Sequence, residues 1–321
     1  MKHLILFISF SLFYSIDFSQ KINIVSQSIE SDSSFYDIEK INKNEFWAGG
    51  ENGILKKIDS LGNISSLNFP NEGLNILKIV SEGNYIFIVT DNAVIYRYDI
   101  INQQFIKKTF LKFKNRCFYD IIALQNGSLM VCGGTSGISK GEKKIPFGFI
   151  GIIDLELNDI KTVWKSNRKF VWSLLELENG DILASTFNGL NTKIIKTENN
   201  KDWTKNNKIK GLVHHIALLN NNVWFSGTRN SHFKETGIIQ TKDQKQLLLN
   251  KTGCLWRMNT VIGNIISVTA NGKLIMLDKT TSEINQIDTS PFAFYNIEKI
   301  SESKILVVGH GKSICIIDFN E

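Results

Sequence analysis

A short strand-like motif recurs seven times along the 321-residue chain and restricts the folds that are open to it. Its clearest copies, at 35–41, 118–124 and 294–300, begin with Phe-Tyr followed by Asp or Asn and then isoleucine. The seven copies end at residues 41, 80, 124, 177, 218, 261 and 300, so the repeat averages about 43 residues. A period of this size is typical of a four-stranded blade in a closed ring of blades.

Each copy of the motif is followed by three more segments with strand character. The second segment is rich in aromatic and β-branched residues, as at 46–50 and 305–309, and the third often ends in aspartate, as at 94–99. The fourth is the most polar, for example at 105–110, which is typical of an outer edge strand. No window shows the apolar spacing of a helix with caps. The sequence therefore predicts an all-β fold, a seven-bladed β-propeller.

The two ends of the chain complement each other in this arrangement. The third strand of the seventh copy ends at Asp318 and only three residues follow, whereas 22–28 is a strand outside the repeats. We expect residues 22–28 to form the outer strand of the last blade, because this closure ties the ends of the ring together. Residues 20–321 then form a single seven-bladed propeller domain.

Residues 1–19 have the features of a secretory signal peptide. Lys2 precedes a run, 3–16, that has no Asp, Glu, Lys or Arg, and the small residue Ser19 lies shortly after it. This run is shorter than the roughly 20 residues that cross a bilayer as a helix, so we expect cleavage after Ser19. An uncleaved anchor is the alternative. The sequence thus predicts an exported protein without a membrane span, located in the periplasm, at the outer membrane or outside the cell.

Four cysteines are widely scattered through the chain, at Cys117, Cys132, Cys254 and Cys315. Export favours disulfides, but a chain of this length has enough core to be stable without them. In the predicted hairpin that contains Cys132, pairing Leu124 with Leu129 places that cysteine opposite Ile121. We therefore expect four buried free thiols, which behave as small apolar side chains.

Two segments resemble known propeller families. Residues 196–205 resemble a degenerate Asp-box, Ser/Thr-x-Asp-x-Gly-x-Thr-Trp, in which Trp203 matches while Glu198, Asn200 and Asp202 depart from the pattern. Residues 46–55 are similar to the blade opening of photosystem II assembly-factor-like propellers. The resemblance implies a propeller in which the Asp-box is a structural turn. The five arginines lack the spacing of the sialidase triad, so the resemblance does not imply that enzyme activity.

In the aligned copies, the position four residues before the end is mostly polar. It holds Asp37, Ile76, Asp120, Ser173, His214, Arg257 and Asn296. Because first strands line the channel of a propeller, we expect this column to form a ring of side chains that faces the channel. Such a ring suits a small polar ligand or holds only water. If the protein is an enzyme, Asp37, Asp120 and His214 are the candidate catalytic residues.

Metal and cofactor sites are not indicated by the sequence. His214 and His215 are adjacent, so a regular strand points them to opposite faces and they cannot chelate one ion together. No cluster of cysteine and histidine has ligand spacing. The sequence also has no phosphate-binding loop or dinucleotide fingerprint, so we expect no metal and no cofactor.

Positive charge is concentrated in three segments, 107–116, 161–169 and 201–210. They contain thirteen lysines and arginines, Arg116 among them, and one acidic residue, Asp202. The segments are outer strands with their following loops, so we expect them side by side on three successive blades. An anionic glycan or an acidic protein surface suits such charge, whereas export argues against nucleic acid. An ordinary solvated lysine surface is the alternative.

Long loops add further candidate contacts to the same face. The connections 134–146 and 228–236 are the longest between second and third strands, and long loops on a rigid scaffold commonly bind ligands. The candidate ligand contacts include five residues named above, Arg116, Asp120, His214, Arg257 and Asn296. Five more complete the set: Trp172, Trp256, Arg229, His232 and Phe233. Trp172 and Trp256 are expected near the channel mouth.

These observations predict an exported, non-catalytic propeller that serves as a protein-binding or glycan-binding assembly module in the cell envelope. We expect it to act as a monomer or as one subunit of a hetero-complex. The alternative is a propeller hydrolase or lyase that acts on polysaccharide or glycopeptide through carboxylates at the channel mouth.

Overall fold

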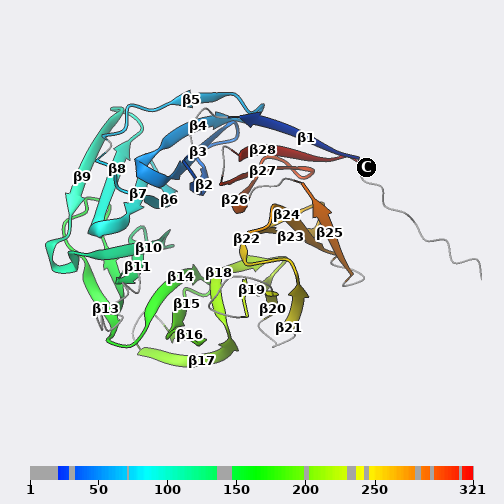
Figure 1. The fold of residues 1–321 in the computed structure, drawn as a ribbon. Helices are drawn as coiled ribbons and strands as arrows, with labels where there is room; N and C mark the ends of the chain where they lie inside the picture. The colour runs from blue at the N-terminus through cyan, green and yellow to red at the C-terminus, as the bar shows by residue number, and fades with distance from the viewer. Residues whose placement is uncertain are drawn as a thin grey trace, which may run out of the picture.

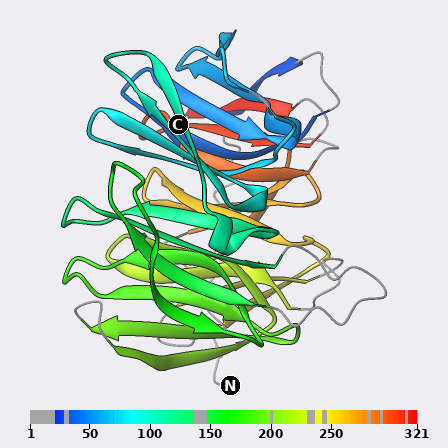
Figure 2. The ribbon, with the colours of Figure 1, turned by 90° about the vertical axis from the view of Figure 1, so that its left-hand side faces the viewer.

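The protein forms seven four-stranded antiparallel sheets arranged in a ring around a central axis (Figure 1), which confirms the predicted seven-bladed β-propeller. Seen from the side, the blades follow one another around the ring (Figure 2). The computed structural model describes residues 21–28, 33–70, 72–135, 147–198, 202–229, 236–241, 246–278, 283–289, 293–310 and 313–320. The predicted signal peptide, residues 1–19, lies outside the described residues.

Six blades use four consecutive strands, with the first strand innermost. Blades one to three contain β2 (Phe35–Lys40), β3 (Glu45–Gly50), β4 (Leu55–Asp59), β5 (Ile64–Ser66), β6 (Ile76–Glu82), β7 (Tyr85–Thr90), β8 (Val94–Asp99), β9 (Gln104–Thr109), β10 (Arg116–Ala123), β11 (Leu129–Thr135), β12 (Gly148–Ile153) and β13 (Lys161–Ser166). Blades four to six contain β14 (Phe170–Glu176), β15 (Ile182–Phe187), β16 (Asn191–Glu198), β17 (Asp202–Lys210), β18 (Leu212–Leu219), β19 (Asn222–Thr228), β20 (Thr236–Thr241), β21 (Gln246–Asn250), β22 (Leu255–Val261), β23 (Asn264–Thr269), β24 (Lys273–Leu277) and β25 (Ile284–Asp288). Three single-turn 3-10 helices are η1 (Glu51–Gly53), η2 (Asp91–Ala93) and η3 (Leu111–Phe113).

The seventh blade is built from both ends of the chain. It consists of β26 (Phe294–Lys299), β27 (Lys304–Gly309), β28 (Ser313–Asn320) and, as its outer strand, β1 (Lys21–Ser28). β1 pairs antiparallel with β28 along its whole length, and the two lie side by side in Figure 1. The predicted closure of the last blade by the N-terminal strand is therefore confirmed. Among the described residues, no helix is long and apolar enough to cross a membrane.

Every first strand carries a β-bulge near its start. The register against the second strand shifts between Phe35 and Asp37 in the first blade and between Val171 and Ser173 in the fourth, and each of the other five blades has an equivalent shift. A bulge leaves one residue unpaired and turns its side chain away from the regular alternation. The residues in the bulges are Tyr36, Leu77, Tyr119, Trp172, His214, Trp256 together with Arg257, and Tyr295.

Apolar layers between neighbouring blades form the core. One cluster joins blades two and three through residues such as Phe87, Phe118 and Phe149, all of which are fully buried. Some second strands end in glycine because the backbone just before the first strand leaves no room for a side chain there. A Cβ at Gly50 would lie 1.9 Å from the carbonyl oxygen of Ser34, so no other residue fits there.

The recurring aspartate that ends the third strand organises the following turn. The carboxylate of Asp99 accepts hydrogen bonds from the backbone N–H groups of Ile101 and Asn102, at 2.9 and 3.0 Å. The bond from Asn102 lowers the pKa of Asp99. Asp154 bonds the backbone N–H of Asn158 in the same way, at 3.0 Å. These aspartates are therefore explained by hairpin structure.

The four cysteines are buried free thiols, as expected. The hairpin that contains Cys132 differs from the expected register by one residue, because Ala123 pairs with Leu129 and Cys132 lies opposite Asp120. The physical reason is the turn, in which the N–H of Leu124 bonds the carbonyl oxygen of Ser128 and so takes Leu124 out of pairing with Leu129.

Candidate functional site

The bulge residues of all seven blades meet at one mouth of the central channel. Together with Arg257 they line a cavity of about 280 Å³. We call this set the aromatic mouth: Tyr36, Leu77, Tyr119, Trp172, His214, Trp256, Arg257 and Tyr295. Because every one of these side chains comes from the start of an innermost strand, the site is built on the most rigid part of the scaffold.

Most rings of the aromatic mouth touch their neighbours around the channel. Tyr119 stacks on Trp172 with ring centroids 4.7 Å apart, and Trp172 meets the imidazole of His214 edge-on at 5.0 Å. Trp256 continues the series, 4.2 Å from His214 and 5.4 Å from Tyr295. Such contacts hold the rings in fixed orientations, so a ligand would not have to order them.

Arg257 is the cationic group of the aromatic mouth. Its side chain is partly exposed, and it forms no ion pair with any other residue in the part of the chain that the structure describes. Burial and, to a smaller extent, the charge of Arg257 lower the pKa of neighbouring His214 to about 3, so that imidazole is neutral at physiological pH. The mouth thus combines an apolar, ring-lined wall with one positive charge.

The residues directly after the bulges form a second layer, which we call the polar hub: Asp37, Lys78, Asp120, Ser173, His215, Met258 and Asn296. Several of them accept a hydrogen bond from a backbone N–H of the next blade. The acceptor–donor pairs are Asp37 Oδ2 with Ile79 N at 2.7 Å, Asp120 Oδ2 with Leu174 N at 2.8 Å, Ser173 Oγ with Ile216 N at 3.3 Å and His215 Nδ1 with Met258 N at 3.2 Å. The polar hub therefore ties consecutive blades together.

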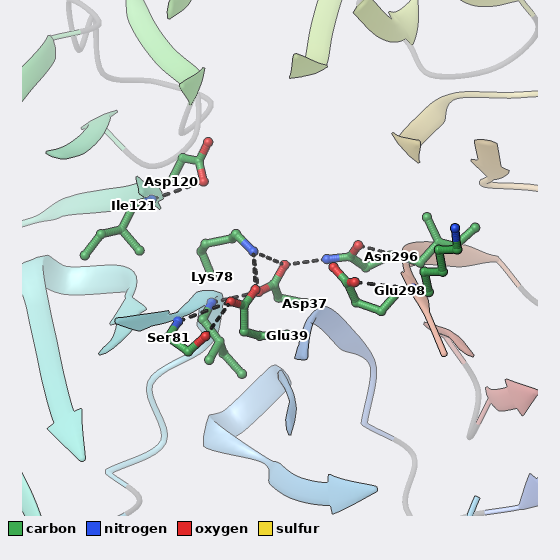
Figure 3. Close-up of polar contacts among 11 residues, drawn as sticks. Asp37, Glu39, Lys78, Ser81, Asp120, Ile121, Asn296 and Glu298 are labelled. Atoms are coloured by element: carbon green, nitrogen blue, oxygen red, sulfur yellow. Dashed lines mark hydrogen bonds and ion pairs between the residues drawn. The ribbon is translucent and has the colours of Figure 1, made fainter. Parts of the chain in front are cut away.

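An acidic cluster extends the polar hub where blades seven, one and two meet (Figure 3). Lys78 Nζ lies 3.1 Å from Asp37 and 3.7 Å from Glu39, and Asn296 donates to Asp37 from the last blade. Glu39 also accepts a hydrogen bond from the backbone of Ser81, at 3.1 Å. Burial and, to a smaller extent, the nearby Glu39 raise the pKa of Glu298 to about 8. Asp37 and Glu39 thus share one ammonium group at the junction that closes the ring, and Glu298 lies near them.

The single column predicted from sequence is wrong in part, because the structure divides it between two layers and the core. Asp37, Asp120, Ser173 and Asn296 lie in the polar hub, His214 and Arg257 in the aromatic mouth, and Ile76 in the core between blades one and two. The alignment assumed that the first strands of blades two and five end at Val80 and Leu218, whereas they end at Glu82 and Leu219. In the sixth blade, two residues rather than one lie in the bulge.

Tyr36, Tyr119 and Tyr295 were missed as site residues. The sequence does hold a signal, because an aromatic residue precedes the polar one in several copies of the motif. Regular alternation along a strand would have pointed these rings away from the channel. Trp172 and Trp256, by contrast, lie at the channel mouth as expected.

The remaining candidate contacts lie apart from the aromatic mouth. Arg116 is at the start of β10, with its guanidinium 3.7 Å from the centre of the Phe147 ring. Arg229 is exposed after β19, where its N–H bonds the carbonyl oxygen of Thr236. His232 and Phe233 fall outside the described residues. Within the described ranges, no three His, Cys, Asp or Glu side chains are grouped to hold a metal ion.

Comparisons with known proteins give the same fold. No family model matches the chain, and no curated protein matches its sequence. Among solved structures, YCF48 bound to D1 peptide has a TM-score of 0.67 at 14% identity over 95% of this chain and 97% of that one. Virginiamycin B lyase from Staphylococcus aureus has a TM-score of 0.70 at 12% identity over 94% and 100%, and the WD40 propeller domain of Doa1 has 0.68 at 10% over 94% and 98%. At such low identity the likeness is one of architecture, and it agrees with the resemblance to photosystem II assembly-factor-like propellers.

Proposed function

We propose that the protein is a non-catalytic binding module that takes a segment of a partner protein into the aromatic mouth. The observation that carries this proposal is the recurrent bulge, which in six of seven blades presents a ring to the channel. Rings that are held in place and left partly exposed supply contact area at low entropic cost, which is how peptide-binding surfaces commonly work. The solved complex of YCF48 with D1 peptide supports a peptide ligand for this architecture.

The size and lining of the cavity favour a peptide side chain. Its volume of about 280 Å³ is below the roughly 300–1,000 Å³ of typical small-molecule pockets, so it holds only part of a larger ligand. The lining offers tyrosine and tryptophan rings, one imidazole and one guanidinium, and no carboxylate or amide side chain among the described residues to hold sugar hydroxyls. A glycan is therefore the weaker candidate ligand.

The alternative function, hydrolysis or lyase chemistry through Asp37 and Asp120, receives less support. Asp37 is fully buried, and its carboxylate is held by Lys78, Asn296 and the backbone of Ile79. Asp120 is 1% exposed and accepts the N–H of Leu174. Neither carboxylate lines the mouth, so neither is placed to reach a substrate there.

We further propose that the module works in the cell envelope. The support is the pattern of residues 1–19, with Lys2, an uncharged apolar run and the small residue Ser19 before Gln20. The full chain, with residues 1–19 in place, is expressed in a bacterial host that exports proteins. N-terminal sequencing of the exported protein should give Gln20 as the first residue. Recovery in the cytosol with Met1 intact would contradict the proposed location.

The binding proposal is tested by selecting peptides from a random phage library on the wild-type protein. Peptides that depend on the site should be enriched on the wild type and at least tenfold less on a Trp172→Leu variant, with Tyr85→Phe as a matched control away from the mouth. A glycan array and a polysaccharide turnover assay run in parallel. The proposal would be overturned if peptides were enriched equally on the wild type and on Trp172→Leu. It would also be overturned if the wild type turned over a polysaccharide and Asp37→Asn and Asp120→Asn abolished that turnover.

A further inference from the structure

Four cations gather on the rim of blades three and four. Two of them lie at the starts of strands that also carry the aromatic mouth. Arg116 is the first residue of β10 and Lys169 directly precedes β14, each three residues before a ring of the mouth. Phe147 links them, because it bridges to Lys169 and its ring lies against Arg116. Lys193 and Lys208 face each other across β16 and β17. We call Arg116, Lys169, Lys193 and Lys208 the basic rim.

The charges of the basic rim are poorly compensated within the described chain. Arg116 Nη1 is buried and has no hydrogen-bond partner among the described residues, and burial lowers the pKa of this guanidinium. Burial also lowers the pKa of Lys169, and the charge of Lys193 lowers it further. Like charges directly opposite on paired strands, such as Lys193 and Lys208, destabilise a sheet. The arrangement therefore has an electrostatic cost in the absence of an anion.

Several other cations of the chain are neutralised by nearby acidic side chains. Lys196, three residues beyond Lys193 on the same strand, lies 2.7 Å from Asp181. Lys112 pairs with Asp159 at 2.8 Å, and Lys304 pairs with Asp318 at 3.0 Å. None of the four cations of the basic rim forms such a pair with another described residue. Within β16, therefore, Lys196 has an acidic partner whereas Lys193 faces another lysine.

A row of rings connects the basic rim to the aromatic mouth. Phe170, which follows Lys169, lies 5.7 Å from Trp172 and 5.9 Å from Tyr119 between ring centroids. A chain that leaves the mouth over Tyr119 and Trp172 would thus pass Phe170 and reach Lys169 next. The rings of the aromatic mouth and the positive charges of the basic rim would therefore bind successive parts of one ligand.

From this geometry we infer that the basic rim binds an acidic stretch of the same partner segment whose apolar side chain enters the aromatic mouth. The inference rests on the proposed function and adds the chemistry of the partner: an apolar or aromatic residue followed by several Asp or Glu residues. An acidic stretch is favoured because its charge complements that of the basic rim. A peptide is favoured over a polyanionic glycan because the rim is continuous with the ring-lined mouth.

The test uses two fluorescein-labelled synthetic peptides, each with one phenylalanine followed by five glutamates or by five glutamines. On the wild type, the glutamate peptide should bind at least tenfold more tightly than the glutamine peptide. This advantage should shrink at least fivefold when NaCl rises from about 50 to about 500 mM. The double variant Lys169→Gln/Lys193→Gln should lose the advantage, whereas the matched control Lys196→Gln should keep it.

The outcomes separate this inference from the proposed function. If Trp172→Leu weakens both peptides and the double variant weakens only the glutamate peptide, both stand. If the double variant binds the glutamate peptide as tightly as the wild type does, while Trp172→Leu binds it more weakly, the acidic stretch is ruled out. Peptide binding at the aromatic mouth then still stands. If heparin binds through Lys169 and Lys193 and neither peptide does, the rim is a glycan site and the inference is overturned.

Discussion

Trp172 and Ser173 are neighbours in β14, yet they belong to layers with different tasks. Trp172 lies in the aromatic mouth, partly exposed and in contact with other rings. Ser173 is fully buried in the polar hub, where its hydroxyl accepts the N–H of Ile216 in the next blade. The bulge at Trp172 produces the difference, because it turns the Trp172 side chain to the channel opening and leaves Ser173 to join the blades. One-residue irregularities thus allow the same strands to build both the ring and its binding surface.

The largest effect that separates the two layers is expected from Asp37→Ala in the polar hub. This change leaves the Lys78 ammonium, whose side chain is 15% exposed, without its main partner, and it removes the acceptor for Ile79 N–H. Breaking a buried ion pair from one side typically costs about 3–5 kcal/mol. Urea unfolding should show a loss of that order, while Asp99→Ala in an exposed turn loses about 1 kcal/mol or less. Equal losses for the two variants would contradict a structural role of the hub.

The acidic cluster predicts a stability that falls as the solution becomes more alkaline. In the folded protein the pKa of Glu298 is raised to about 8 from its usual 4.5, so the folded state holds a proton that the unfolded state releases. Stability from this group is complete below about pH 4.5 and is lost as the pH rises to about 8, because ionised Glu298 then faces Glu39 and Asp37 with only Lys78 to compensate.

The melting temperature of Glu298→Gln measured against pH isolates this effect. The variant keeps the shape of the protonated carboxyl and cannot ionise, so its melting temperature should fall less than that of the wild type between about pH 6 and 9. Parallel curves for the two proteins would show that Glu298 is already ionised at pH 6.

A smaller loss is expected from Ser173→Ala. The variant leaves the buried N–H of Ile216 without its acceptor, which typically costs about 1–2 kcal/mol. Ser65→Ala, at an exposed serine of β5 outside the hub, serves as a comparison and should change the unfolding free energy by about 0.5 kcal/mol or less. A Ser173→Ala protein as stable as the wild type would remove Ser173 from the set of residues that join blades.

The ring of blades could be read from sequence because its signals are local and repeated. The Phe-Tyr motif marks the first strands, and the unpaired strand 22–28 matches the missing fourth strand of the last blade, now seen as β1 beside β28. The bulges left no comparable signal, since a bulge is decided by how two strands pair. For this reason the polar column was aligned as one ring although Ile76 lies in the core.

The acidic cluster and the basic rim were also beyond sequence reasoning in their final form. Glu39, Lys78 and Glu298 come from three blades, and only ring closure brings residue 298 next to residue 39. The excess of lysine was visible in segments 107–116, 161–169 and 201–210, but the sequence did not indicate which lysines form ion pairs with acidic side chains. Lys112 pairs with Asp159, whereas Lys193 faces Lys208.

The most direct test of the two-layer account is the affinity of the adjacent variants Trp172→Leu and Ser173→Ala for a peptide selected on the wild-type protein. We expect at least a tenfold loss of affinity for Trp172→Leu and less than a twofold change for Ser173→Ala at a temperature where both are folded. A Ser173→Ala protein that loses as much affinity as Trp172→Leu, or a Trp172→Leu protein that loses none, would contradict it.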